Sequence, residues 1–314
     1  MRRLSVLIVA VLMMVMPAHA GKLNIVTTVG MIGDLVSEVA GNRADVSTLI
    51  GEGVDPHSYR TTRSDVILLG RADVIIHNGL YLEAQMEELL HKLAKKKPVI
   101  ALGETLPKEQ LFASDEYPDK FDPHIWMSPA LWKEAAENAR DELIRLDPEG
   151  ESEFRKNAAA YITRLDALSD YVKRSALSVP ENSRVLVTAH DAFGYFGKAY
   201  GFEVLGIQGI STQSEAGLLR IEELVNLLVE RRVSAVFVES SVSERNIRAL
   251  VEGAAARGHK VIVGGELFSD AMGAPGTYEG TYIGMLDHNA TVISRALGGN
   301  APARGLNNRL GAGS

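Results

Sequence analysis

Two copies of one tripeptide carry the first chemical signal in this chain. His57 ends the segment Asp55-Pro56-His57, and His124 ends the segment Asp122-Pro123-His124. Proline fixes its own φ and biases the preceding residue toward extended backbone, so both segments are stiff. A stiff loop holds an imidazole in one direction, as a metal ligand requires. The repeat therefore favours a metal site that uses both histidines.

Two more candidate ligands follow apolar segments in the second half of the chain. His190 comes after the strand-like run 185–189, and Asp270 follows the run 261–263. Ligands of open α/β proteins collect at the carboxyl ends of parallel strands. Three imidazoles and one carboxylate, two from each half, would form a closed tetrahedral N₃O site. The alternative, that all four are ordinary polar loop residues, stays open on spacing alone.

The remaining histidines lack this placement. His91, His259 and His288 lie on polar faces or loops of predicted helices, where solvated side chains are expected. The position of His77 along the chain places it near the expected cleft between the two halves, but no other feature supports it as a ligand. Glu239 follows a strand-like run and is a candidate to orient a metal-bound imidazole, which such ligands usually require. An ordinary salt bridge is the alternative for Glu239.

Alternating strand-like and helical patterns must position these residues. The alternation predicts parallel βαβ units with helices on both faces of each sheet. Between the two alternating regions, residues 149–178 are predicted to form one helix, because apolar side chains recur every three or four residues. The predicted fold is α/β, with two lobes joined by a single long linking helix. The predicted segments are an N-terminal metal-binding lobe at 21–147, a linking helix at 148–179, a C-terminal metal-binding lobe at 180–298 and a disordered tail at 299–314.

The first twenty residues predict export. Arg2 and Arg3 precede an apolar run from Leu4 to Met16, and Ala18-His19-Ala20 has the small-x-small form of a signal-peptidase site. The run is shorter than the roughly 20 residues of a membrane-spanning helix. We therefore expect residues 1–20 to be a cleaved signal peptide and the mature protein to be periplasmic, without insertion into the membrane.

Composition excludes several other classes. The chain has 314 residues and a formal net charge of −7, with no block of basic residues that would bind nucleic acid. It has no cysteine, so it can form neither a disulfide nor a lipid anchor on an N-terminal cysteine. These properties predict a soluble monomer that is stabilised by its apolar core.

Several longer motifs together make the chain similar to a known family. It resembles the metal-specific solute-binding proteins of ABC importers, the zinc- and manganese-binding group called TroA-like or cluster A-I. The resemblance implies that His57, His124, His190 and Asp270 are the metal ligands. It also implies a rigid linking helix, small lobe movements on metal binding and docking to a membrane permease. The motifs that carry the resemblance are Gly53 to Tyr59, Ala72 to Glu83, Asp122 to Trp126, Thr188 to Tyr195, Ile207 to Glu215 and Phe268 to Asp270.

Two departures from family patterns bear on the metal. Zinc importers of this kind commonly carry a long loop rich in histidine and acidic residues, whereas Asp115 to Asp122 is acidic without histidine. Many manganese- and iron-binding members have glutamate at the third ligand position, where this chain has His190. Nitrogen ligands suit zinc, and manganese prefers more oxygen. We therefore expect zinc as the bound ion, with manganese as a close alternative.

The expected function is capture of a divalent transition metal ion and its delivery to an ABC importer, without enzymatic activity. Two alternatives remain, a periplasmic zinc-dependent hydrolase and a surface adhesion protein. Catalytic zinc sites usually have three protein ligands and keep one position open for water, which a four-ligand site would lack. The chain also has no His-Glu-x-x-His pair and no Gly-x-Ser-x-Gly elbow.

Overall fold

A computed structural model describes residues 21–114 and 117–311 of the chain. The predicted signal peptide, residues 1–20, lies outside the described residues, as do positions 312–314. Within the described ranges, no helix has both the length and the apolar character that crossing a bilayer would need.

The N-terminal lobe is built on a parallel four-stranded sheet. Its strand order is β2-β1-β3-β4, so the first strand lies inside the sheet. The second strand and the third pair with opposite edges of the first: Ile25 is in register with Val46 on one side and Val74 on the other. The strands are β1 (Leu23–Val29), β2 (Ala44–Ile50), β3 (Val74–His77) and β4 (Val99–Ala101), and the helices are α1 (Gly30–Ala40), α2 (Arg63–Arg71) and α3 (Glu87–Ala94).

The C-terminal lobe repeats the parallel arrangement with two strand pairs, β5-β6 and β7-β8. Strands β5 and β7 lie next to each other in the middle of the lobe. Both are buried on two faces: in β5, Leu186 joins the large core shared with the N-terminal lobe, whereas Val185 and Val187 join a separate core under α7 and α8. The elements are β5 (Val185–His190), α6 (Gly194–Tyr200), β6 (Glu203–Gln208), α7 (Leu218–Glu230), β7 (Ala235–Glu239), α8 (Arg245–Ala256), β8 (Ile262–Leu267) and α9 (Tyr282–Ala296).

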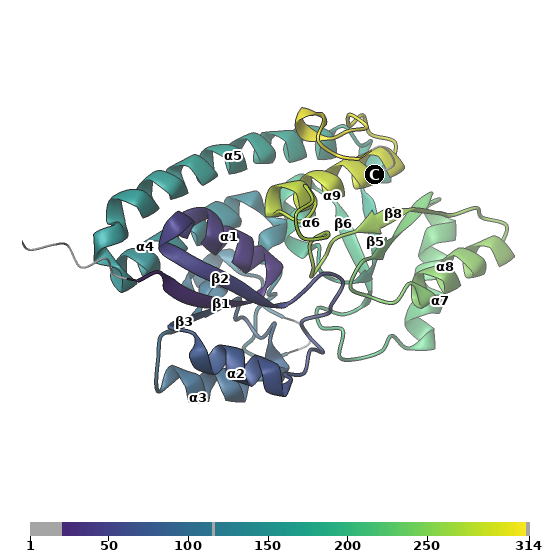
Figure 1. Cartoon of the computed structure of the whole chain (residues 1–314). Coiled ribbons are helices and arrows are strands. Elements are labelled where there is room, and N and C mark those ends of the chain that lie inside the picture. Colours follow the sequence, from purple (N-terminus) through teal and green to yellow (C-terminus); the bar gives the residue numbers. More distant parts are fainter. Residues whose placement is uncertain (1–20, 115–116, 312–314) are drawn as a thin grey trace, which may run out of the picture.

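One long helix connects the lobes. Helix α5 (Glu151–Leu177) has 27 residues, roughly 40 Å at the usual rise, and follows α4 (Pro129–Leu146) after a short turn. Figure 1 shows α5 along one side of the molecule, with both lobes on the same side of it. It packs against α1 and α4 of the N-terminal lobe and against α9 of the C-terminal lobe. The predicted two-lobed α/β fold with one long helix is confirmed.

Short 3₁₀ turns complete the chain. They occur where the backbone changes direction between the longer elements, and two of them flank α4. Their bounds are Gly41–Arg43, Ala84–Met86, Leu102–Thr105, Lys108–Gln110, Ile125–Met127, Pro148–Gly150, Glu181–Ser183 and Leu306–Asn308.

The segment after α9 differs from the disordered tail that composition predicts. Ala301 is 3% exposed and Leu310 is fully buried. The backbone amide of Leu306 donates to both carboxylate oxygens of Asp287 at 2.9 Å. The low apolar content of the segment did not indicate this order, because one buried leucine and a few backbone hydrogen bonds are enough to fix a short segment. The described part of the tail, residues 299–311, is therefore packed against α9.

Candidate metal centre

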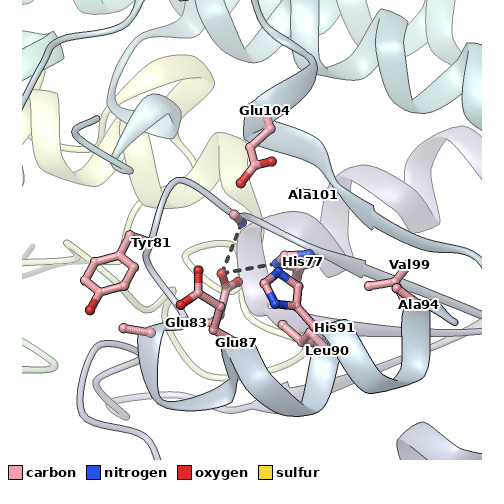
Figure 2. A pocket seen from close by; sticks show the side chains of 12 residues that line it. His77, Tyr81, Glu83, Glu87, Leu90, His91, Ala94, Val99, Ala101 and Glu104 are labelled. Carbon is pink, nitrogen blue, oxygen red and sulfur yellow. Dashed lines mark hydrogen bonds and ion pairs between the residues drawn. The ribbon is translucent and has the colours of Figure 1, made fainter. Parts of the chain in front are cut away.

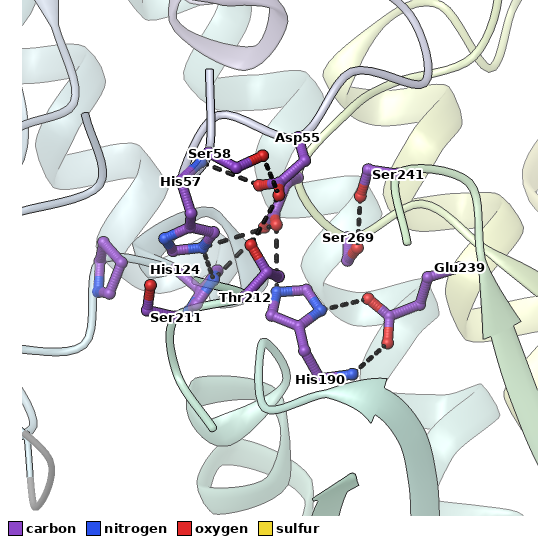
Figure 3. Close-up of polar contacts among 12 residues, drawn as sticks. Asp55, His57, Ser58, His124, His190, Ser211, Thr212, Glu239, Ser241 and Ser269 are labelled. Carbon is purple, nitrogen blue, oxygen red and sulfur yellow. Dashed lines mark hydrogen bonds and ion pairs between the residues drawn. The ribbon is translucent and has the colours of Figure 1, made fainter. Parts of the chain in front are cut away.

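The four predicted ligands come together between the lobes. His57 lies in the loop after β2, and His124 lies just before the turn that leads into α4. His190 is the last residue of β5, and Asp270 follows β8. One donor atom from each of the four lies within 4.8 Å of all the others. Figure 3 shows the three imidazoles turned toward one another.

The separations between donor atoms fit a small tetrahedral ion. His57 Nε2 lies 3.3 Å from His124 Nε2, and His124 Nε2 lies 3.3 Å from Asp270 Oδ1. Asp270 Oδ2 lies 3.0 Å from His190 Nε2 and 3.6 Å from His57 Nε2. Ligand bonds of 2.0–2.1 Å to a tetrahedral zinc ion would place neighbouring donors about 3.3 Å apart. An ion fits between these atoms with little movement of the side chains.

Several of these atoms lack the hydrogen bonds that burial normally demands. His190 Nε2 and both oxygens of Asp270 are buried, and within the described part of the chain none has a hydrogen-bond partner. His190 Nε2 lies at ion-pair distance, 3.0 Å, from Asp270 Oδ2. A buried polar group without a partner costs free energy. A metal ion at the centre would satisfy all three atoms at once.

Buried carboxylates orient two of the imidazoles. Asp122 Oδ1 lies 2.7 Å from His124 Nδ1 and also accepts the His124 backbone amide at 2.9 Å. Glu239 makes the same pair of contacts with His190, at 2.5 Å to Nδ1 and 2.9 Å from the backbone amide. A carboxylate on Nδ1 fixes the tautomer that presents Nε2 to a metal. The structure thus brings Glu239 to the position that its strand end suggested.

The role of aspartate in the two Asp-Pro-His segments was missed by sequence reasoning. Asp55 Oδ1 accepts the backbone amide of His57 at 2.9 Å, as Asp122 does for His124. Aspartate that bonds the amide two residues ahead forms a local turn. The repeated spacing of aspartate and histidine was therefore a readable signal of that turn. Aspartate as well as proline therefore fixes the backbone of these two segments.

Burial and neighbouring charges shift the pKa values of the four candidate ligands in different directions. Burial lowers the pKa of His57 to about 4, although Asp270 opposes the shift. Burial also acts to lower the pKa of His124, but Asp122 and Asp270 outweigh it and raise that pKa to about 9. The pKa of His190 is raised well above its usual value, because the carboxylates of Asp270 and Glu239 outweigh the effect of burial. Burial acts to raise the pKa of Asp270, but His190 and His124 outweigh it and hold that pKa well below the usual range.

The other histidines lie away from this centre. His77 ends β3, and its Nδ1 lies 3.5 Å from Glu83, a buried carboxylate that also accepts the backbone amides of Asn78 and Gly79. Figure 2 shows His77 in a separate pocket of about 210 Å³, where His91 also points inward. None of the four candidate ligands lines this pocket. His77 therefore lies apart from the four candidate ligands.

His259 and His288 are less solvated than expected. His259 Nε2 lies 2.7 Å from the carbonyl oxygen of Val233, and His288 Nε2 lies 2.9 Å from that of Glu266. Burial also lowers the pKa of His288. His288 thus joins α9 to β8, and His259, in the loop after α8, bonds the chain just before β7; periodicity alone does not reveal these contacts.

Comparison with known proteins matches this geometry to a family. The family described as the zinc-uptake complex component A, periplasmic, matches residues 25–296. The chain belongs to this family. Its match spans both lobes, α5 and all four candidate ligands.

Relatives within this family carry names with different metals. The chain is 48% identical over 280 residues to the zinc-binding protein TroA of Treponema pallidum, covering 89% of this chain and 90% of TroA. It is 46% identical over 276 residues to the manganese-binding lipoprotein MntA of Bacillus subtilis, covering 88% and 90%. The solved structure of the periplasmic zinc-binding protein TroA superposes with a TM-score of 0.86, covering 88% of this chain and 99% of that one.

Proposed function

We propose that this protein captures a divalent transition metal ion through His57, His124, His190 and Asp270 and delivers it to the permease of an ABC importer. Membership of the family supports metal capture for such an importer. The observation that carries the ligand assignment is the set of buried donors without hydrogen bonds, His190 Nε2 and the two oxygens of Asp270. These atoms point at one centre that a cation would complete.

Zinc is the proposed cargo, with manganese as the close alternative. Three nitrogen donors and one carboxylate suit zinc, and manganese favours a larger share of oxygen. The names of relatives include both metals. The argument for zinc therefore rests on His190, the ligand position at which nitrogen replaces the oxygen of a glutamate.

A transport role is favoured over catalysis by the number of protein donors. A catalytic zinc site keeps a position for water or substrate. Here four side chains supply donors at tetrahedral spacing, and each of them is at most 2% exposed. A hydrolase would need one of these four to leave, and a surface adhesin would have no use for a buried metal centre.

The remaining parts of the proposal concern location and organisation. We assign residues 1–20 to a cleaved signal peptide and the mature protein to the periplasm, where it acts as a monomer. The names of relatives include both periplasmic proteins and lipoproteins. We divide the mature chain into metal-binding lobes at 21–147 and 180–298, joined by the linking helix at 148–179. The packing of α5 against both lobes supports this division.

The test is competitive metal binding by the purified mature protein. Titration against a chromogenic chelator should give one zinc ion per chain and weaker binding of manganese. Mass spectrometry of protein isolated from periplasm should find the same metal. Binding of more than one ion with equal affinity, or no tight binding of either metal, would contradict the proposed site.

A further inference from the structure

The four ligands are not held equally. His124 and His190 each have a buried carboxylate on Nδ1, whereas the contacts of the His57 ring with other described side chains run through Nε2. The loop before His57 is exposed from residue 51 to residue 54. His57 is therefore the ligand whose position depends on how its loop is held from outside.

A segment of the C-terminal lobe holds that loop. We call residues 211–214, which follow β6, the strap. Thr212 Oγ1 donates to Asp55 Oδ2 at 2.6 Å, and Gln213 Nε2 donates to the carbonyl oxygen of His57 at 3.0 Å. Gln213 Oε1 also accepts from Gln85 of the N-terminal lobe at 3.3 Å. Three hydrogen bonds thus fasten the strap across the gap between the lobes.

The strap is itself anchored to its own lobe and faces open space. Gln208, the last residue of β6, donates from Nε2 to the carbonyl oxygens of Thr212 and Ser214 at 3.2 and 3.0 Å. Asp55 and Thr212 line a cavity of about 610 Å³ that extends toward α7 and α8. Figure 3 shows Thr212 beside Asp55 and close to the imidazole of His57. The strap therefore stands between the candidate ligands and this cavity.

The opposite side of the centre is closed by buried contacts. Trp126 Nε1 donates to the carbonyl oxygen of Ser269 at 2.7 Å, which ties the His124 segment to the residue before Asp270. Tyr195 donates to the carbonyl oxygen of Asp122 at 2.9 Å, again across the lobes. These bonds lie in the core, whereas those of the strap are part-exposed. Opening by the strap breaks fewer buried interactions than opening on this side.

We propose that the strap is the gate for metal exchange, and that Thr212 sets the rate by holding the Asp55-Pro56-His57 loop closed over the ion. This inference rests on the proposed metal capture. Thr212 does not reach the ligand atoms and acts as a positioning residue through Asp55. Release of the metal then requires the Thr212–Asp55 bond to break and His57 to swing toward the cavity, while His124, His190 and Asp270 stay in place.

The test is the rate of zinc loss from the loaded, full-length mature protein into excess chromogenic chelator. Thr212→Val keeps the side-chain shape but removes the hydrogen bond to a charged carboxylate, which corresponds to a rate change of about tenfold or more. We expect zinc to leave at least tenfold faster from this variant. Thr212→Ser keeps the hydroxyl and should restore the slow rate. Ser214→Ala, on the same exposed strap, is the matched control and should resemble the wild type.

Hydrogen exchange locates the opening. In the metal-free protein, Thr212→Val should speed amide exchange in residues 53–59 and leave residues 122–127 unchanged. An unchanged rate of zinc loss in a variant that still binds one zinc ion would overturn the gate, as would faster exchange confined to residues 122–127. If the wild type binds no zinc, the proposed function fails first, and the gate falls with it.

Discussion

The two Asp-Pro-His segments have the same sequence but different surroundings. Asp122 is buried and uses one oxygen for both the amide and the imidazole of His124. Asp55 is part-exposed, bonds only the amide of His57, and gives its second oxygen to Ser58 and Thr212. One tripeptide thus places one candidate ligand among buried partners, on what we call the fixed side of the site, and the other beside part-exposed partners, at what we call its mouth.

The comparison shows that a repeated motif sets local backbone geometry but not the partners of the aspartate side chain. Both aspartates fold the chain so that the histidine follows a tight turn. What differs is the partner of the second aspartate oxygen and the depth of burial. We expect the fixed segment to control affinity and the mouth segment to control exchange.

The largest expected effect is on pH dependence. A metal must displace the protons held by His124, whose pKa is raised to about 9, and by His190, whose pKa is also raised well above its usual value. His57, with its pKa lowered to about 4, carries no proton at neutral pH. Affinity should therefore rise with pH until about pH 9, by up to about 100-fold per unit. Chelator competition from pH 6 to 9 measures this slope.

Calorimetry in buffers of different ionisation enthalpy provides the matching control for the pH experiment. It should count about two protons released per zinc ion at pH 7, both from the fixed side of the site. Affinity that levels off near pH 6.5, the ordinary histidine pKa, would mean that the two carboxylates do not hold these protons.

Removal of His190, on the fixed side, should lower zinc affinity more than removal of His57, at the mouth. His190→Ala should weaken zinc binding more than about 100-fold, because loss of an outer partner alone typically costs 10–100-fold. His57→Ala should cost about tenfold less, since water from the adjacent cavity can fill the empty position. Isothermal titration measures both, with His91→Ala as the control for an exposed histidine.

Circular dichroism should show that His190→Ala keeps its fold, because the side chain contributes coordination and little apolar packing. Equal losses of affinity in His57→Ala and His190→Ala would remove the distinction between the two sides. Unchanged zinc binding in His190→Ala would remove that ligand from the site.

Substitution of Asp122 should likewise lower zinc affinity more than substitution of Asp55. Asp122→Asn removes the charge on His124 Nδ1 and should lower zinc affinity about 10–100-fold. It should also lower the pKa of His124 and reduce proton release by about one. Asp55→Asn leaves the imidazole of its histidine untouched and should change affinity by less than about threefold. Direct titration of the two variants at pH 7 compares them, and a larger loss in Asp55→Asn would reverse our assignment.

The smallest effect on binding is expected from the bonds between the lobes, where stability is the better readout. Trp126→Phe leaves the carbonyl oxygen of Ser269 without its buried donor and should lower the free energy of unfolding by about 1–3 kcal/mol. Gln85→Ala, which removes only the exposed 3.3 Å bond to Gln213 of the strap, should lower it by less than about 0.5 kcal/mol. Urea unfolding of the metal-free proteins tests this. Similar losses in the two variants would show that both sides are equally rigid.

Much of the fold was accessible from the sequence because its signals were local and strong. The apolar stripe from Phe154 to Val172 predicted α5, and the alternation of strands and helices predicted two lobes with parallel sheets. The candidate ligands were accessible because parallel strands end on one edge of a sheet. His190 and Glu239 end neighbouring strands, so a strand-end reading placed both near the centre.

What escaped prediction depended on contacts between distant segments. The bond from Thr212 to Asp55 joins residues 157 positions apart, and no periodicity encodes it. Helix boundaries also depend on side-chain contacts: Thr62 and Ser64 are both residue types that cap helices, and α2 begins after Thr62 because Thr62 and Asp65 form a reciprocal capping box. Two residues that can cap a helix lie so close together here that residue type alone does not predict which of them caps it.

Helix α5 has a practical consequence for the design of an optical metal sensor from this protein. The helix packs against both lobes along one edge, so it fixes the spacing of their outer ends. A pair of fluorophores on those ends would report almost no change in energy transfer when zinc binds. A single environment-sensitive dye on an engineered cysteine at Ser214 would sit on the strap instead, in a chain with no other thiol to compete for the label.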